Sequence, residues 1–284
     1  MISGIPAGTK MAILIYNPLM QDTLVCINHT ESMIPASNTK LFTTATALEL
    51  MGGNHLLSTK ILADDDELRD GTIEGDIYIK GFGNPTFSSE DLEELVNQLY
   101  QSGLRKITGN VVGDDTYFDD VYSRDDWISE ERANVKLPPI SALVIDRNRT
   151  IVTKKRKGKY RNYFVNVKNP PLFAAEILRE KLISFGVEVV GKPISGQTDK
   201  NAKPLVDSSI ELRKLLQMIN KHSDNFYAEC LFKTLGSAYS GQQGNSFFST
   251  QAILNYIEDN NIYSTGTKIV DGSGISRFDQ VTAG

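Results

Sequence analysis

Two short apolar runs lie near the start of the chain, residues 11–17 and 23–28, and a polar stretch with a proline separates them. Compact apolar runs flanked by turn residues are typical of β-strands joined in a hairpin. The second run contains Cys26, and Cys230 follows Phe226 by one helical turn in a later apolar run. Two cysteines so far apart cannot form a disulfide framework. A single bridge stays open, but these patterns favour two packed thiols.

A helical pattern begins after Pro35, at Ser37, and continues until the Gly52-Gly53 pair, which is a typical helix terminator. From about residue 61 to residue 206 the pattern changes to short strands and turns. Two segments in this stretch, residues 88–103 and 170–186, have apolar residues at helical spacing.

The last part of the chain is mainly helical. Residues 208–236 contain two helical stretches on either side of Ser223, and residues 249–261 form another, for which Ser249 is the expected N-cap. The basic run 154–161 (KKRKGKYR) is interpreted as a solvated hairpin tip. The change of pattern between about residues 61 and 206 indicates an insertion between two other parts of the chain.

Composition limits the functional classes. The chain has 284 residues, 40% of them hydrophobic, and a formal net charge of -5. Nucleic-acid binding depends on an excess of Lys and Arg, so this balance argues against it. The apolar runs are too short for a membrane-spanning helix, and the first 17 residues lack the pattern of a secretory signal.

One S-x-x-K pair, Ser37 and Lys40, lies at the start of the first helix. The spacing puts both side chains on one helix face, where a lysine amine with a lowered pKa can accept the serine proton. Alone, such a pair is a weak signal, because an N-cap serine and a solvated lysine are common. The surrounding helix is uncharged and rich in small residues, which favours a buried Lys40 and therefore the catalytic interpretation.

A second candidate is the S-D-N triplet of Ser223, Asp224 and Asn225, between two helices. These residues could serve only as helix caps. The alternative is functional: the Ser223 hydroxyl relays a proton to the leaving amine, and the Asn225 amide holds the substrate carbonyl.

Three segments together carry a specific resemblance: PASNTKLFTTATAL, HSDNFYAECLF and IVDGSGISRFDQVT. They resemble the D-alanyl-D-alanine carboxypeptidase/endopeptidase family, the class C penicillin-binding proteins of the penicillin-binding protein 4 type. KGFGNPTF and GNVVGDDTYFDD are similar to that family as well. The resemblance spans nearly the whole chain.

The resemblance implies an α+β protein. Residues 1–62 and 206–284 would form a serine β-lactamase/transpeptidase-like domain, with helices around an antiparallel sheet, and residues 63–205 an inserted α/β-rich domain. It implies that Ser37 is acylated, that Lys40 is the base, and that Ser223 and Asn225 complete the site. Peptidoglycan stem peptides and β-lactam antibiotics are the implied ligands, no cofactor is expected, and the implied location is periplasmic or otherwise extracytoplasmic.

Two departures from the family pattern matter. The third motif, K-T-G, is not found up to Gly284: Lys233-Thr234 is followed by Leu, and Thr265-Gly266 is preceded by Ser. In the family this motif supplies a cation for the substrate carboxylate and an oxyanion-hole N–H. The inserted region is also shorter than in the larger members, so a nested third domain is expected to be reduced or missing.

An acidic tract surrounds Trp127. In the family, an acidic residue near such a tryptophan receives the free amino group of a meso-diaminopimelate side chain, which makes Glu130 the candidate and leaves Glu131 and Asp126 open. A solvated loop is the simpler explanation for most of the tract.

The three histidines, His29, His55 and His222, show no metal-binding spacing, and no metal site is expected. Two rivals to a D-Ala-D-Ala carboxypeptidase stay open. One is a serine β-lactamase or esterase of the same fold, and the other is a catalytically silent peptidoglycan-binding protein.

Overall fold

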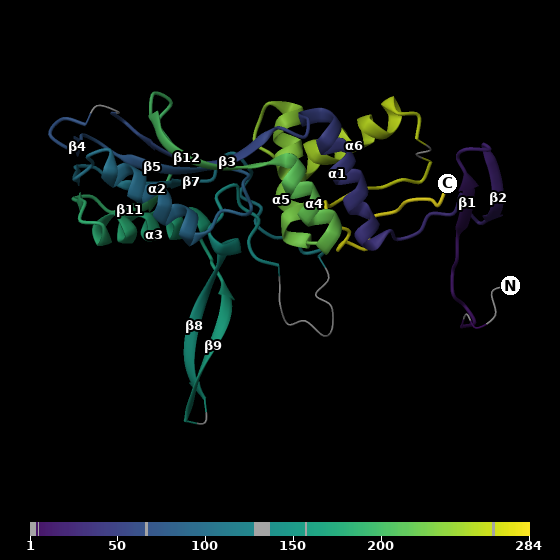
Figure 1. Cartoon of the computed structure of the whole chain (residues 1–284). Helices are drawn as coiled ribbons and strands as arrows, with labels where there is room; N and C mark the ends of the chain where they lie inside the picture. The colour runs from purple at the N-terminus through teal and green to yellow at the C-terminus, as the bar shows by residue number, and fades with distance from the viewer. Residues whose placement is uncertain (1–3, 5, 66–67, 128–136, 157, 263–264) are drawn as a thin grey trace.

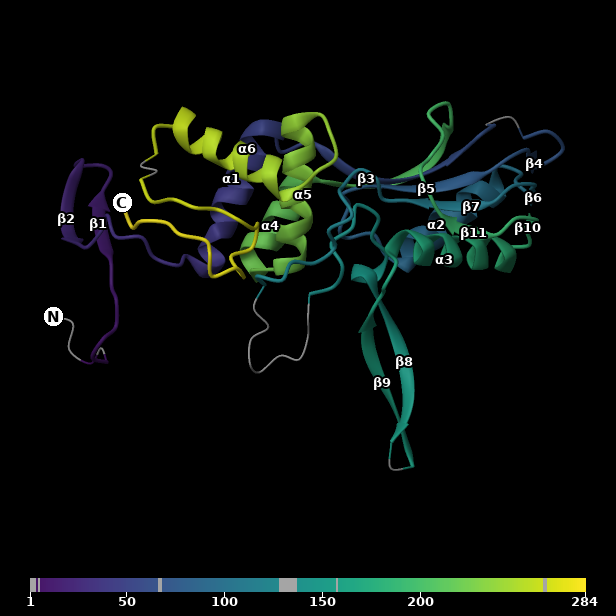
Figure 2. The same cartoon turned by 180° about the vertical axis from the view of Figure 1, so that it is seen from behind.

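The computed structural model describes residues 4, 6–65, 68–127, 137–156, 158–262 and 265–284. Figures 1 and 2 show an elongated molecule with a helical body in its middle. At one end lies a hairpin of β1 (Ile13–Asn17) and β2 (Asp22–Ile27). At the other end, helices pack on a larger sheet. The described elements therefore confirm the α+β class expected from the sequence.

The larger sheet has the strand order β11-β7-β5-β3-β12. Its strands are β3 (Leu56–Ala63), β5 (Ile77–Phe82), β7 (Val111–Asp114), β11 (Pro193–Ser195) and β12 (Lys203–Glu211). The pairs β11–β7 and β7–β5 are parallel, whereas β5–β3 and β3–β12 are antiparallel. A small parallel sheet lies beside it, formed by β4 (Thr72–Ile73), β6 (Lys106–Ile107) and β10 (Glu188–Val189).

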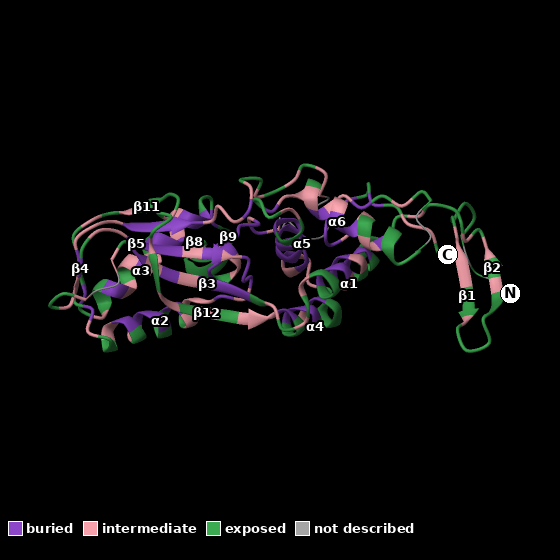
Figure 3. Ribbon diagram, turned by 90° about the horizontal axis from the view of Figure 1, so that it is seen from above, coloured by how far each residue is buried: buried purple, intermediate pink, exposed green. Residues whose placement is uncertain are grey.

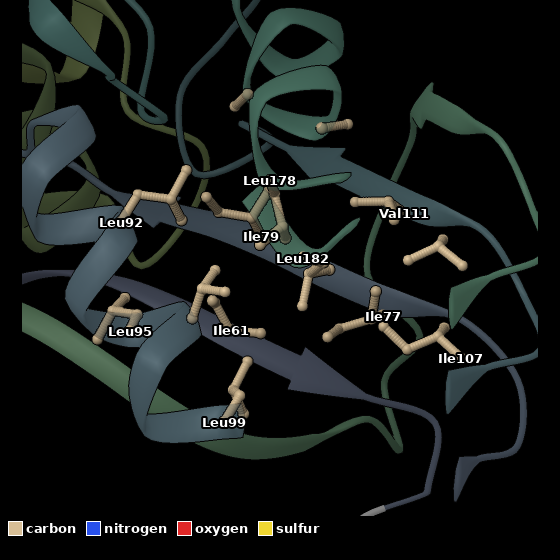
Figure 4. Close-up of a cluster of buried hydrophobic side chains, with 14 of the residues drawn as sticks. Ile61, Ile77, Ile79, Leu92, Leu95, Leu99, Ile107, Val111, Leu178 and Leu182 are labelled. Carbon is tan, nitrogen blue, oxygen red and sulfur yellow. The ribbon is translucent and has the colours of Figure 1, made fainter. Parts of the chain in front are cut away.

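Two helices pack against this sheet, α2 (Ser89–Gln101) and α3 (Pro170–Ser184). Each begins at a strong start signal: Ser88 forms a capping box with Asp91, and Asn169 caps a helix whose first residues are prolines. Their apolar faces and the sheet enclose one large core (Figure 4). Its buried side chains include Ile61, Ile77, Ile79, Leu92, Leu95, Leu99, Ile107, Val111, Leu178 and Leu182.

The chain enters and leaves this region through neighbouring strands. β3 follows the helix α1 (Thr39–Met51), and β12 leads into α4 (Leu212–His222). Along this antiparallel pair, Leu62 lies opposite Pro204 and Ile61 lies opposite Val206. The predicted domain boundaries at residues 62 and 206 therefore fall side by side on paired strands, and the domain division itself stays a prediction.

The helical body consists of α1, α4, α5 (Asn225–Ser240) and α6 (Ser246–Asp259). Helix α5 lies at its centre and is buried along most of its length, as Figure 3 shows. Its apolar side chains contribute to three clusters. One joins α5 to α1 and α4, another joins it to α6 and Ile269, and the third joins Phe226 and Cys230 to Ile140 and Val144. This packing fixes the start of α5 against the start of α1.

A second hairpin projects from the body, formed by β8 (Arg149–Arg156) and β9 (Lys159–Asn166). Figures 1 and 2 show that it stands clear of the other elements over its distal half. The basic run 154–161 forms its end, which confirms the predicted solvated hairpin tip.

Two local predictions were wrong. Cys26 is exposed, because β1 and β2 form a sheet of only two strands and none of the described elements covers that side chain, whereas Cys230 is buried as predicted. Ser249 does not cap the last helix, which begins at Ser246 and is capped by Asn245. The Ser249 hydroxyl instead donates to the Phe232 and Asn245 carbonyls inside the helical body. Within the described ranges, no helix is both long and apolar enough to span a bilayer.

Candidate active site

Ser37 lies in a 3-10 turn, Ala36–Asn38, that leads directly into α1. The turn leaves Ser37 exposed, while Lys40, three residues later, is buried with an exposed fraction of 2%. The Lys40 ammonium donates to the Ser37 hydroxyl over 3.3 Å. The i, i+3 pair therefore meets as the sequence predicted, with the nucleophile candidate facing solvent and the base candidate behind it.

Two further acceptors hold the Lys40 amine. The Nζ atom lies 2.6 Å from Asn225 Oδ1 and 2.7 Å from the Ser273 carbonyl oxygen. An ammonium has three donors, and these partners with Ser37 satisfy all of them. The first residue of α5 and the D-G-S-G segment thus converge on the first turn of α1.

Burial lowers the pKa of Lys40 below its ordinary value, and the negative charges of Glu229, Asp271 and Asp224 partly oppose this effect. A general base works best when its pKa lies near the working pH. The desolvated position of Lys40 is therefore suited to accepting the Ser37 proton.

The backbone before Ser37 is held in an uncommon conformation. Ala36 has φ of 47°, in the left-handed region that residues with a Cβ rarely adopt. Gly274 packs directly on the Ala36 carbonyl, so closely that a Cβ at this glycine would overlap with it. Gly274 itself has φ of 77°, a second reason for glycine here. The D-G-S-G segment therefore supports the turn that presents Ser37.

The S-D-N triplet spans the junction of α4 and α5. Ser223 is exposed and has φ of 52°, and within the described part of the chain its hydroxyl makes no hydrogen bond. Asp224 caps α5 by accepting from the Tyr227 amide, and Asn225 reaches Lys40. The structure thus brings Ser37, Lys40 and Asn225 into one hydrogen-bonded group. The Ser223 hydroxyl is not part of this group.

Arg147 clamps Asp224 from the inserted region. Its guanidinium donates two hydrogen bonds of 2.8 and 2.9 Å to the two carboxylate oxygens of Asp224. Burial opposes ionisation of Asp224, but the hydrogen bonds and charge of Arg147, together with hydrogen bonds from the Tyr227 and Phe226 amides, keep the pKa of that carboxyl below its ordinary value. Arg147 lies in a turn of three successive left-handed residues, 146–148, which is unfavourable for residues with a Cβ.

Three buried carboxyl groups stand behind the site. Asp271 accepts from the amides of Ser273, Gly274 and Ser276, and thereby folds the D-G-S-G segment around itself. Glu229, on α5, accepts from the Gly272 amide. Asp279 is the third member.

The environment favours the protonated form of two of these groups. Burial and the neighbouring charge of Asp271 raise the pKa of Glu229 to about 8. The same two causes raise the pKa of Asp279 to about 7, and its oxygens accept from the Val270 amide and the Thr39 hydroxyl. A protonated carboxyl can still accept from a backbone amide through its carbonyl oxygen, so these groups can hold the segment while they are neutral.

Of the acidic candidates near Trp127, Glu130 and Glu131 lie outside the described residues. Asp126 is engaged by Arg124, which donates two hydrogen bonds of 2.8 and 2.9 Å, and by the Ser276 hydroxyl. These hydrogen bonds lower the pKa of Asp126. All three residues stay predictions as substrate contacts.

Lys233 belongs to the Lys233-Thr234 pair that was compared with the K-T-G motif, but its side chain makes structural contacts instead. Its ammonium donates to Asp119 and to the Val121 carbonyl, both in the inserted region. Among the described residues, no group of three or more His, Cys, Asp or Glu side chains is arranged to hold a metal ion.

Arg147, Glu229, Asp271 and Arg124 were not found from the sequence as site residues. Glu229 did carry a usable signal, because it is the one acidic residue in the apolar run 226–232, where burial of a charge needs an explanation. No pattern in the sequence points to Arg147 as a site residue, because its turn forms only through long-range packing.

Comparison with known proteins gives consistent matches. The sequence matches the D-Ala-D-Ala carboxypeptidase 3 (S13) family over residues 3–163 and 155–284. A D-alanyl-D-alanine carboxypeptidase of an Actinomadura species is 26% identical and is aligned over 97% of this chain and 63% of the relative. The D-alanyl-D-alanine carboxypeptidase DacB of Haemophilus influenzae is 22% identical, over 98% of this chain and 69% of the relative.

Among solved structures, penicillin binding protein 4 (dacB) from Haemophilus influenzae superposes with a TM-score of 0.85 at 21% identity, over 98% of this chain and 73% of that chain. This likeness confirms the transpeptidase-like fold with an inserted region that the motif segments led us to expect. The chain spans between about half and two thirds of the length of the curated relatives it matches.

Proposed function

The chain belongs to the D-Ala-D-Ala carboxypeptidase 3 (S13) family, and from this membership we propose that it is a serine-type D-Ala-D-Ala carboxypeptidase acting on peptidoglycan stem peptides. The observation that carries the proposal is the buried Lys40 amine, 3.3 Å from the exposed Ser37 hydroxyl and held by Asn225 and Ser273. An exposed nucleophile backed by a desolvated base is what acyl transfer requires.

In the proposed reaction, Ser37 Oγ attacks the carbonyl carbon of the penultimate D-Ala while the Lys40 amine takes its proton. The peptide C–N bond then breaks, and the terminal D-Ala leaves as an amine after receiving a proton, with Ser223 as the relay. Water, deprotonated by the same base, attacks the ester and releases Ser37. In this scheme Asn225 Oδ1 orients the Lys40 amine, which its 2.6 Å contact supports, and the Asn225 Nδ2 group donates to the substrate carbonyl.

The same acylation chemistry serves endopeptidase cleavage of cross-links, which differs in the shape of the substrate site rather than in the nucleophile. We also propose that β-lactams acylate Ser37. A second structure of the Haemophilus influenzae protein holds a β-lactam, which supports this idea for a chain of the same fold. Since peptidoglycan lies outside the cytoplasm, we propose an extracytoplasmic site of action.

The test is to incubate the full-length protein with a labelled penicillin and to locate the adduct by peptide mass spectrometry, alongside D-Ala release from a stem pentapeptide. We expect one adduct, on Ser37, and its loss in Ser37→Ala but not in Ser184→Ala, a matched change at an exposed serine on α3. Labelling of another residue would contradict the assignment. Rapid penicillin hydrolysis without D-Ala release would indicate a β-lactamase instead.

A further inference from the structure

The β8–β9 hairpin carries an unusual distribution of charge. Within residues 149–166 there are seven Lys and Arg residues and no acidic residue, whereas the whole chain has a net charge of -5. The distal half of the hairpin comprises residues 153–162. Its described basic side chains are all exposed: Lys154, Lys155, Arg156, Lys159 and Arg161. The hairpin is therefore a strongly cationic arm on an acidic protein.

The register places like charges directly opposite each other. Lys154 is paired with Arg161, and Arg156 with Lys159. Because residues two apart on a strand share a face, these four side chains form one block on one face of the hairpin. Like charges directly opposite each other on paired strands are destabilising. In the part of the chain that the structure describes, none of the four has a carboxylate partner. A bound external anion would therefore reduce the repulsion between them.

The arm also separates this block from the acidic body. Eight residues of β-strand at about 3.3 Å each give a reach of about 26 Å. The Debye length at physiological salt is only about 8 Å, so the distal charges act largely independently of the body's negative charge. An acidic protein can thereby present a positive surface to an anionic partner.

The other face of the distal half carries an aromatic side chain. Tyr160 has an exposed fraction of 71% and lies opposite Lys155, whose Nζ is 5.6 Å from the centre of its ring. Tyrosine is enriched where apolar and aqueous phases meet, because its ring is apolar and its hydroxyl is polar. Basic residues around an aromatic side chain at the end of an arm fit a lipid headgroup layer.

We propose that the distal half of β8–β9 docks the protein on an anionic phospholipid bilayer. The positions of the charges favour a bilayer over a linear polyanion. They lie at the end of a projecting arm, where a planar surface can meet both faces at once, and not along a groove that would follow a polymer. This inference does not depend on the proposed peptidase activity.

The test measures co-sedimentation of the protein with vesicles of phosphatidylcholine alone or mixed equally with phosphatidylglycerol. We expect binding only to the mixed vesicles, and weaker binding as salt is raised. A variant with Lys154→Gln, Arg156→Gln, Lys159→Gln and Arg161→Gln should bind at least a hundredfold more weakly, since each basic residue near such a surface contributes about fivefold. Its control removes the same charge elsewhere, with Lys192→Gln, Lys200→Gln, Lys203→Gln and Lys214→Gln, and should bind within a fewfold of wild type.

A second variant separates loss of charge from loss of the hairpin. Lys154→Glu with Lys159→Glu turns both repulsive pairs into attractive ones, so the hairpin is retained while the block becomes neutral. We expect this variant to lose vesicle binding and to keep its thermal stability. Equal binding to neutral vesicles, or retained binding by this variant, would overturn the proposal. Binding to soluble polyphosphate but not to vesicles would overturn it in favour of a polymer partner.

Discussion

Glu229→Gln tests the buried carboxyl cluster behind the site. The wild-type carboxyl has a pKa raised to about 8, against an ordinary value of 4.5. Each pKa unit corresponds to about 1.4 kcal/mol, so ionising this group in the folded protein costs on the order of a few kcal/mol. The pKa of Glu229 is higher in the folded than in the unfolded protein. The stabilisation that its protonated carboxyl contributes to the free energy of unfolding is therefore fully present below about pH 4 and is lost as the pH rises through about 8.

Glutamine keeps an oxygen that can accept from the Gly272 amide but does not ionise. We therefore expect Glu229→Gln to be within about 1 kcal/mol of wild type near pH 4, where the carboxyl is protonated in both the folded and the unfolded state. The variant should be more stable than wild type above pH 8. Between about pH 4 and about pH 8 its free energy of unfolding should fall less steeply than that of wild type. Urea unfolding at a series of pH values measures this difference.

Two controls sharpen the measurement. Glu180→Gln changes an exposed glutamate on α3 and should leave the pH dependence unchanged. Asp279→Asn should remove the part of the slope that ends near pH 7, where that carboxyl titrates. Parallel stability curves for Glu229→Gln and wild type across the whole window would refute the idea that Glu229 is held protonated by its surroundings.

Three further changes test the site. Lys40→Met should slow penicillin acylation by about 10²–10⁴-fold in stopped-flow measurements while leaving the fold intact, and a rate near wild type would exclude Lys40 as the base. Arg147→Ala should destabilise the protein by roughly 1–2 kcal/mol in urea unfolding, since it removes two charged hydrogen bonds at a partly exposed pair. Gly274→Ala should slow acylation by displacing Ala36, with steady-state acylation kinetics as the readout, and an unchanged rate would mean that the Ser37 turn does not depend on this contact.

Much of the fold follows from local patterns. The stretch after Pro35, with its small residues and terminal glycines, predicted α1, and Ser37 and Lys40 meet because a helical turn brings residues three apart together. The resemblance drawn from three motif segments is confirmed by the family match. These features depend on neighbours in sequence or on motifs that carry their own spacing.

The rest of the site depends on contacts that no local pattern encodes. Asn225 lies 185 positions from Lys40, and the Ser273 carbonyl lies 233 positions away. Arg147 reaches Asp224 only because three residues adopt a left-handed turn against the core of the inserted region. The Ser249 prediction failed for a similar reason, since the helix begins three residues earlier, at Ser246, and the Ser249 hydroxyl donates to the Phe232 carbonyl of α5.

The contact between Arg147 and Asp224 has a consequence for attempts to build a smaller enzyme. The paired strands at residues 62 and 206 look like a natural place to cut out the middle of the chain and join the ends. Such a minimal protein would keep Lys40, which donates to the Ser37 hydroxyl, yet it would lose the guanidinium that anchors the start of α5. Residues 63–205 thus contribute a structural contact to the candidate active site, and we expect the two parts of the chain to tolerate recombination between relatives only when they are exchanged together.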